Sequence, residues 1–126
     1  MSGFRAALEK HLQAIQDRDL DGLAATVAEQ LVLVTSRGEL HRSRRTFLEL
    51  PADWVKVPGW SLGTELVWQG ESADLATAVL ALVYQEGAKT PERSYLTLGF
   101  ARFPAEGGGE RWLMVLDQNT PVRTAG

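Results

Sequence analysis

Three side chains of this sequence are the main candidates for acid–base chemistry: Asp117, His11 and Tyr84. A carboxylate held away from water has a raised pKa, and a general base that works near neutral pH needs such a shift. A histidine titrates near neutrality, and a tyrosine hydroxyl can donate a hydrogen bond to a carbonyl or an oxyanion. Each residue also has a structural interpretation. The aspartate can accept hydrogen bonds at a strand end or face water, the histidine can border the core, and the tyrosine can pack with its hydroxyl at the surface.

Other chemistries have little support in the composition. The sequence contains no cysteine, which excludes disulfides, thiolate nucleophiles and cysteine-ligated metals. Neither His11 nor His41 has an aspartate or glutamate at helical ligand spacing, so we expect no metal and no cofactor. A net charge of −3 gives no electrostatic case for nucleic acid or for an anionic membrane. The basic cluster of Arg42, Arg44 and Arg45 hints at an anionic partner, although a solvated charged turn explains it as well.

The length and the hydrophobic content predict one domain over residues 1–126. A chain of 126 residues with 44% hydrophobic residues is long enough for one core and too short for two ordinary domains. The N-terminus lacks a signal-peptide pattern, and no stretch approaches about 18 uninterrupted apolar residues. We therefore expect a soluble, cytoplasmic protein.

Four long strands are predicted in the C-terminal half, which therefore reads as an antiparallel meander. Their ranges are Trp60–Trp68, Ala73–Gln85, Arg93–Phe103 and Arg111–Asn119, with Gly-rich or Pro-containing breaks between them. The second range also fits a helical stripe, but its β-branched residues and flanking turns favour a strand. Alternation places Leu96, Leu98 and Phe100 on one face, and it places Leu113, Val115, Asp117 and Asn119 on one face of the last strand.

The N-terminal half is predicted to hold three helices and a short hairpin. The helices are Ser2–Asp17, a second one that starts at Asp19 and buries Leu20, Leu23, Ala24 and Val27, and a third one that is capped by Ser43 and ends at Pro51. The hairpin pairs Leu31–Thr35 with Glu39–His41. A loop over residues 53–59 leads into the long sheet.

Four segments carry a resemblance to a known family: Arg18–Leu23, Val34–Gly38, Tyr95–Phe103 and Arg111–Thr120. With the order of the elements, they resemble the nuclear transport factor 2-like superfamily and its SnoaL-like branch. This resemblance implies an α+β, cystatin-like cone in which three helices of the N-terminal half pack on a long, curled, mainly antiparallel sheet, usually in a homodimer. Enzymes of the superfamily usually place a carboxylate inside the apolar cone, often with a tyrosine or a histidine. The tail Leu116–Asn119 differs from the His-rich tail of some members, which counts against a histidine-based site.

We expect an apolar pocket that binds a small, largely hydrophobic molecule. Its expected wall is Phe4, Leu8, Leu48, Trp54, Leu82, Leu98 and Phe100, and its few polar groups are Asp117, Asn119, His11 and Tyr84. Two functions stay open at this point. One is binding or assembly without chemistry, which the shortage of convergent ionisable residues favours, and the other is isomerisation, cyclisation or dehydration with Asp117 as the base. We also expect a homodimer that forms through the outer face of the sheet.

Overall fold

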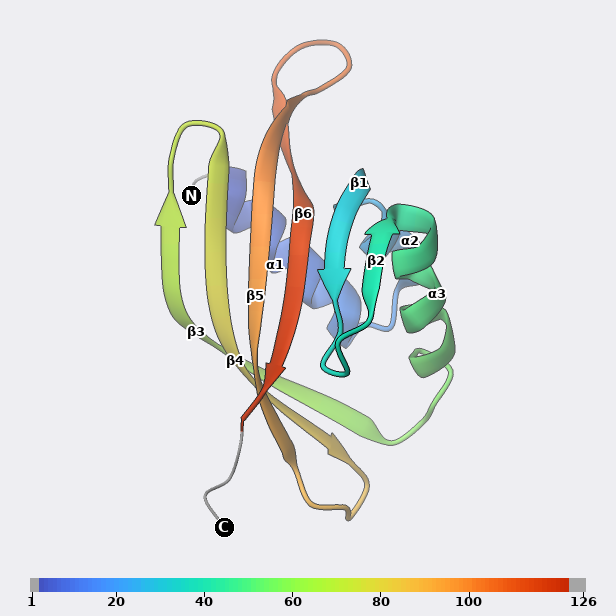
Figure 1. Cartoon of the computed structure of the whole chain (residues 1–126). Helices are drawn as coiled ribbons and strands as arrows, with labels where there is room; N and C mark the ends of the chain where they lie inside the picture. The colour runs from blue at the N-terminus through green and yellow to red at the C-terminus, as the bar shows by residue number, and fades with distance from the viewer. Residues whose placement is uncertain (1–2, 123–126) are drawn as a thin grey trace.

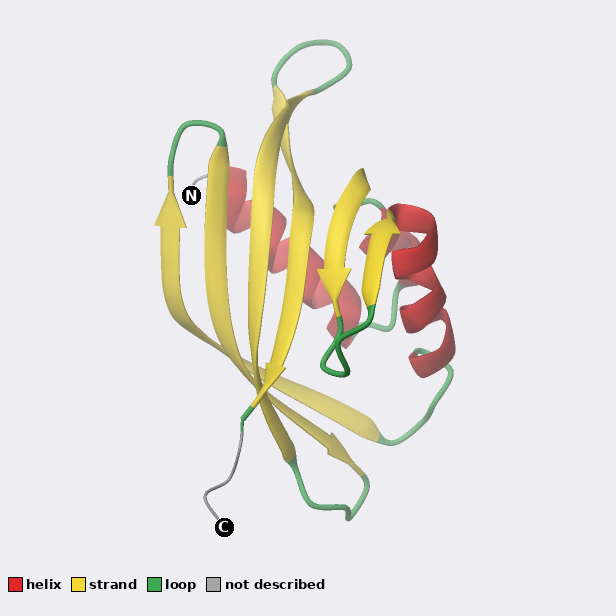
Figure 2. Ribbon diagram, in the orientation of Figure 1, coloured by secondary structure: helices red, strands yellow, loops and turns green. Residues whose placement is uncertain are grey.

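The computed structural model describes residues 3–122, which form three helices and one six-stranded sheet (Figure 1). The strands are β1 (Val27–Val34), β2 (Leu40–Ser43), β3 (Trp60–Glu71), β4 (Leu75–Glu86), β5 (Glu92–Pro104) and β6 (Glu110–Pro121). Their order across the sheet is β2-β1-β6-β5-β4-β3, and all neighbours are antiparallel except β1 and β6, which run parallel. Figure 2 shows α1 crossing behind the sheet and α3 beside β2, so that one face of the sheet carries no helix. The predicted α+β class and the four-stranded meander are confirmed.

The three helices are α1 (Gly3–Gln16), α2 (Leu20–Ala24) and α3 (Arg44–Trp54). Side-chain oxygens cap the last two, as predicted: Asp19 Oδ1 accepts a hydrogen bond from the Gly22 N–H at 2.9 Å, and Ser43 Oγ accepts one from the Thr46 N–H at 3.2 Å.

Two predicted boundaries in the N-terminal half are wrong. Pro51 does not end the third helix, which continues to Trp54. Proline removes only one backbone donor there, and the buried ring and the Val55 N–H bond to its carbonyl at 3.0 Å help to hold this last turn. Val27 does not belong to the second helix but opens β1, which starts four residues before the predicted strand.

The inner face of the sheet is apolar along β4 and β5. Leu80 lies opposite Leu96, and Ala78 lies opposite Leu98. All four side chains are buried, and the predicted face of Leu96, Leu98 and Phe100 is confirmed. The predicted segment Ala73–Gln85 is a strand from Leu75 onward and not a helix.

A bulge in β6 changes the predicted register of the last strand. Phe100 pairs with Met114 whereas Gly99 pairs with Leu116, so Val115 is an extra residue in β6. Because one extra residue reverses the alternation of side chains, Met114 faces inward with Asp117 although the two are three residues apart. The prediction that Leu113 and Val115 share the face of Asp117 is therefore wrong, while the pairing of Asp117 with Leu98 and of Asn119 with Leu96 puts both polar residues on the inner face.

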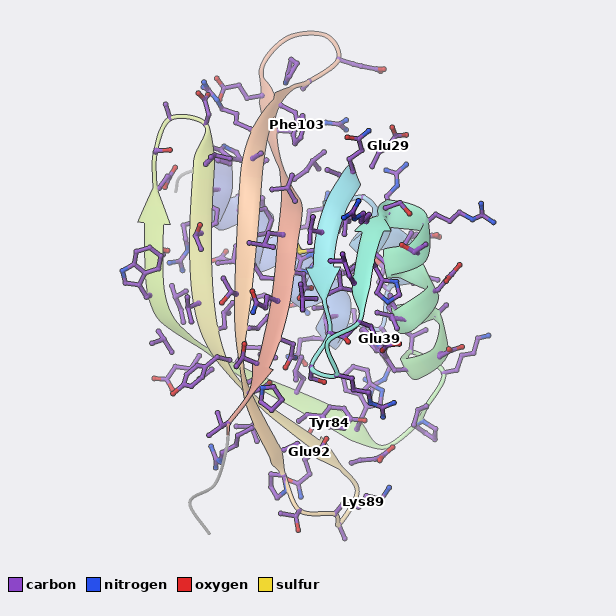
Figure 3. The ribbon with its side chains drawn as sticks, in the orientation of Figure 1. Glu29, Glu39, Tyr84, Lys89, Glu92 and Phe103 are labelled. Carbon is purple, nitrogen blue, oxygen red and sulfur yellow. The ribbon has the colours of Figure 1, made fainter. Side chains whose placement is uncertain are left out.

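The long strands join two different ends of the molecule. Phe103 lies near one end, and Tyr84, Glu92 and Lys89 lie at the opposite end, where β3 to β5 swing toward α3 (Figures 1 and 3).

The end near Phe103, which we call the closed end, is filled by Phe4, Phe100, Trp112 and Met114. Phe4 packs edge-on against Phe100, with ring centroids 5.6 Å apart, and lies 6.2 Å from the Trp112 ring. Phe4, Phe100 and Met114 are all fully buried.

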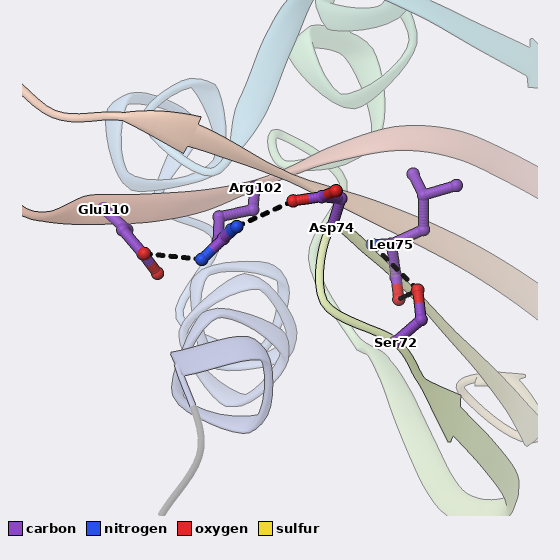
Figure 4. Close-up of polar contacts among 5 residues, drawn as sticks. All are labelled: Ser72, Asp74, Leu75, Arg102 and Glu110. Carbon is purple, nitrogen blue, oxygen red and sulfur yellow. Dashed lines mark hydrogen bonds and ion pairs between the residues drawn. The ribbon is translucent and has the colours of Figure 1, made fainter.

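Ion pairs tie the strands together at the closed end. Arg102 of β5 contacts Asp74 at 2.7 Å and Glu110 of β6 at 2.5 Å (Figure 4). In the neighbouring turn, Ser72 Oγ donates a hydrogen bond to the carbonyl oxygen of Leu75 at 3.0 Å. All these side chains are exposed or nearly so, so their contribution to the free energy of unfolding is modest. The ion pairs connect β5 to the turn before β4 and to the start of β6.

Candidate functional site

The opposite end of the molecule, which we call the open end, contains a cavity of about 690 Å³. The sheet, the second half of α1 and helix α3 enclose it. Its deeper wall is mostly apolar and consists of His11, Ile15, Leu23, Leu33, Phe47, Leu50, Pro51, Trp54, Trp60, Leu62, Leu82, Tyr84, Leu96, Asp117 and Asn119. The remaining lining residues come from the β1–β2 turn, the start of β5 and the end of β6, and they are Thr35, Ser36, Arg37, Glu39, Glu92, Arg93, Ser94 and Pro121. A cavity of this size and composition can hold a small organic molecule.

Asp117 is a carboxylate in the middle of this wall. In β6 it lies between Leu98 of β5 and Leu33 of β1, so the sheet positions it by backbone pairing on both sides. It makes no hydrogen bond or ion pair with any residue in the range 3–122. The side chain is only partly buried, because the cavity gives water access to it, yet the surrounding protein atoms desolvate it and raise its pKa from 3.8 to about 7. Near neutral pH, Asp117 can therefore either accept or donate a proton.

His11 also lines the cavity, but its ionisation differs from that of Asp117. The ring is 1% exposed, and burial lowers its pKa from 6.5 to about 4. Its Nδ1 lies 2.7 Å from the hydroxyl of Thr26, the residue before β1. The imidazole is therefore neutral at physiological pH and acts as a hydrogen-bonding group there, not as an acid. Thr26 was missed by sequence reasoning, since nothing in the chain between positions 11 and 26 indicates this contact.

Tyr84 lies at the wider part of the cavity, on β4. Burial raises the pKa of its phenol, and the nearby carboxylates of Glu86 and Glu92 raise it further. Figure 3 shows Tyr84 and Glu92 close together at this end. Tyr84 therefore keeps its proton and can serve as a hydrogen-bond donor.

An aromatic corner formed by Trp54, Trp60 and Tyr84 closes one side of the cavity. Trp60 stacks on Tyr84 with centroids 6.2 Å apart, and Trp54 meets Trp60 edge-on at 5.2 Å. The Trp60 indole N–H donates to the Trp54 carbonyl oxygen at 2.9 Å, and the guanidinium of Arg18 lies 3.9 Å from the centre of the Trp60 ring. These contacts fix the corner as a rigid wall that needs no ligand to form it.

Six of the eleven residues expected at the site line the cavity, namely Asp117, His11, Tyr84, Trp54, Leu82 and Asn119. The other five do not. Phe4, Leu8, Leu98 and Phe100 belong to the filled core, and Leu48 packs against that core. These five residues do not line the cavity, because side chains fill the inner face of the sheet from Leu98 toward the closed end.

Sequence reasoning also missed part of the wall. Leu96 lines the cavity and lies on the same face of β5 as Leu98, which does not. In α3, Phe47 lines the cavity and the neighbouring Leu48 does not. The charged residues Arg37, Glu39, Glu92 and Arg93 came from turns and strand ends for which the sequence carried no signal.

Among residues 3–122 there is no group of three or more histidine, aspartate or glutamate side chains placed to hold a metal ion. Over the same range, no helix has the length and apolar character that crossing a bilayer requires.

No family model matches the sequence, and no curated protein is similar to it in sequence. Solved structures with the same architecture are described as nuclear transport factor 2-like or as having a cystatin-like fold. A putative calcium/calmodulin-dependent protein kinase type II association domain from Thiobacillus denitrificans is 21% identical, with 94% of each chain covered and a TM-score of 0.78.

Two further structures carry names that refer to a reaction. A putative dehydratase from the nuclear transport factor 2-like family of Streptomyces avermitilis is 14% identical, with 96% of this chain and 95% of that chain covered and a TM-score of 0.79. A ketosteroid isomerase-like protein from Erwinia carotovora is 17% identical, with 95% and 94% covered and a TM-score of 0.71. The chain thus has the fold of the nuclear transport factor 2-like superfamily, as its sequence predicted. At these identities the likeness concerns the fold alone.

Proposed function

We propose that the protein binds a small, largely hydrophobic molecule in the cavity of the open end and that Asp117 transfers a proton to or from it. The observation that carries this proposal is an unpartnered carboxylate on an apolar wall, with a pKa raised to about 7. A carboxylate that served only the fold would be expected to have a backbone or arginine partner. General acid–base catalysis is most effective when the pKa of the catalytic group lies near the working pH.

The reaction class that fits this site is isomerisation, cyclisation or dehydration. In each of these, a base removes a proton from carbon or oxygen and the same group can return it, so one carboxylate suffices. Tyr84 is a protonated hydroxyl that could polarise a carbonyl on the substrate, and Asn119 is a further polar group on the same wall. The names of the dehydratase and the isomerase-like neighbours are compatible with this class. The alternative is binding without chemistry, in which Asp117 serves only as a hydrogen-bonding group.

The test is a comparison of Asp117→Asn with wild type in two assays. A hydrophobic reporter dye that binds in the cavity should still bind to the variant, because the apolar wall is unchanged. The transfer of deuterium from solvent to ketone probes such as 2-tetralone should fall by at least about 100-fold if Asp117 is the base. Asp21→Asn, an exposed aspartate of α2 outside the cavity, is the control. Exchange that survives in Asp117→Asn would remove the catalytic part of the proposal and leave the binding part.

We further propose that a second copy of this chain covers the outer face of the sheet. The large apolar side chains exposed on that face are Val32, Leu40, Trp68, Leu75 and Tyr95. Exposed apolar surface of this kind commonly marks an interface. The face lies opposite to the cavity, so a dimer formed there would leave the cavity free.

A further inference from the structure

The hydrogen bonds around His11 fix the position of its single ring proton. The hydroxyl of Thr26 donates to the carbonyl oxygen of Leu23 at 2.7 Å, which uses the only hydrogen of that hydroxyl. At the 2.7 Å contact between His11 and Thr26, the hydroxyl oxygen must therefore accept, and the imidazole Nδ1 must carry the proton. Since the ring is neutral, its Nε2 then holds a free lone pair. This is the less common tautomer of free histidine, so the relay of Leu23, Thr26 and His11 selects it.

The lone pair on Nε2 has no partner among residues 3–122. The ring cannot turn to find one, because it is 1% exposed and packs edge-on against Phe100, with centroids 6.2 Å apart at an angle of 88°. His11 is also one of the side chains that line the cavity. The cavity therefore contains a hydrogen-bond acceptor of fixed direction that remains uncharged above about pH 5.

We propose that His11 is a specificity-determining residue, which selects apolar molecules that carry a hydroxyl or N–H donor over those of the same shape that lack one. This inference rests on the proposed function only in that the cavity must bind a small hydrophobic molecule. A ligand with a donor satisfies Nε2, whereas an ether or a hydrocarbon that displaces water from the same place leaves a buried acceptor without a partner. Thr26 is a positioning residue, because it acts on the ligand only through the tautomer of His11.

The first test needs no ligand and examines the tautomer directly. Long-range ¹H–¹⁵N correlation spectra of the full chain at pH 7 should show His11 protonated on Nδ1, with the partly exposed His41 as the internal comparison. Thr26→Val, which removes the hydroxyl, should shift His11 toward the Nε2-protonated form, while Thr26→Ser should keep the wild-type tautomer. A wild-type ring protonated on Nε2 would overturn the inference.

The second test compares the matched probes 2-naphthol and 2-methoxynaphthalene by calorimetry. Wild type should bind the naphthol about five-fold more tightly, as expected for one additional hydrogen bond, and His11→Phe should bind the two equally. Asp117→Asn should keep the preference, because Nε2 is unchanged. If Asp117→Asn loses the preference and His11→Phe keeps it, the donor is recognised by Asp117 and the inference about His11 is overturned, while the proposed function stands.

Other outcomes are equally decisive. Equal binding of the two probes to wild type would overturn the inference alone. Failure of both probes to bind would overturn the proposed function and this inference with it. If His11→Phe does not fold, the Thr26→Val and Thr26→Ser pair supplies the same comparison, since only the former should weaken the preference for the naphthol.

Discussion

The closed and open ends of this cone are built from the same strands but differ in what lies between the sheet and the helices. At the closed end, Phe4 packs edge-on against Phe100, and both rings are fully buried. Toward the open end, Leu96 and Leu82 project from the same face of the sheet and line a cavity. Aromatic rings are present at both ends, but they pack against one another in the core at the closed end and line a cavity at the open end. This difference separates the two tasks of the chain, since one end holds the fold and the other holds the candidate chemistry.

The largest effect on stability is expected when a buried aromatic ring at the closed end is truncated. Phe100→Ala should lower the free energy of unfolding by about 4 kcal/mol, because the fully buried ring of Phe100 contacts Phe4 and His11 and its loss leaves a void. Phe47→Ala, on the cavity wall, should cost about 2 kcal/mol, since the space it vacates merges with an existing cavity. Urea unfolding followed by circular dichroism measures both values. Equal losses would mean that the open end is packed as tightly as the closed end.

The pH dependence of stability should distinguish the carboxylate at the open end from an ordinary aspartate. The pKa of Asp117 is about 7 in the folded chain, against 3.8 for an aspartate exposed to water. The folded state therefore binds more protons between these values, and the free energy of unfolding falls as the pH rises from about 4 to 7. Above pH 7, where Asp117 is ionised, its desolvation lowers the free energy of unfolding by up to about 4 kcal/mol. Asp117→Asn should therefore be more stable than wild type at pH 8 and nearly equal to it at pH 4. Urea unfolding at pH 4 and pH 8 measures these stabilities. The control Asp21→Asn should not become more stable than wild type at pH 8.

His11 should produce a slope of the opposite sign from the same cavity. Its pKa is lowered from 6.5 to about 4, so the unfolded chain binds the extra proton and stability is lost as the pH falls from 6.5 to 4. This loss amounts to at most about 3 kcal/mol, and it should be absent in His11→Phe. Thermal unfolding of wild type and variant at pH 4.5 and 7 measures it. A variant that still loses stability in parallel with wild type would show that another group titrates in this range.

The sequence predicted the sheet better than it predicted the cavity. Alternation along β4 and β5 identified the inner face, because side chains in a strand have a period of two that is visible in the chain itself. It failed in β6, where the extra residue Val115 reverses the alternation, and a bulge leaves no mark in the pattern of apolar residues. Asp117 and Asn119 nevertheless share one face, as predicted, because both follow the bulge.

The position of the cavity along that face could not be predicted. Leu82, Leu96 and Leu98 look alike in the sequence, and the depth to which α1 fills the cone depends on where Phe4 meets Phe100 in space. The contact of His11 with Thr26 also could not be predicted from the sequence, because it joins α1 to the residue before β1. Both features depend on distances between elements, which periodicity does not encode.

A smaller effect on stability is expected in α3, the helix that forms part of the cavity wall. Ser43 caps α3, and α3 supplies Phe47, Leu50 and Trp54 to the cavity. Ser43→Ala should cost about 1 kcal/mol and should speed amide hydrogen exchange in α3 before it affects β4 and β5. Ser43→Asp, which retains a capping oxygen, is the matched control. Equal acceleration in α3 and in the central strands would indicate that the two ends unfold as a single unit.

The smallest effect on the stability of one chain is expected on the outer face of the sheet. Tyr95→Lys replaces a half-exposed side chain opposite Ala81 of β4, so it should change the free energy of unfolding of the monomer by no more than about 0.5 kcal/mol. If a second copy covers this face, the same change buries a lysine at the interface and should convert dimer to monomer in sedimentation velocity experiments. Glu106→Gln, in the exposed β5–β6 loop, changes the net charge by the same single unit and should leave the dimer intact. A wild-type chain that sediments as a monomer at all concentrations would rule out this interface.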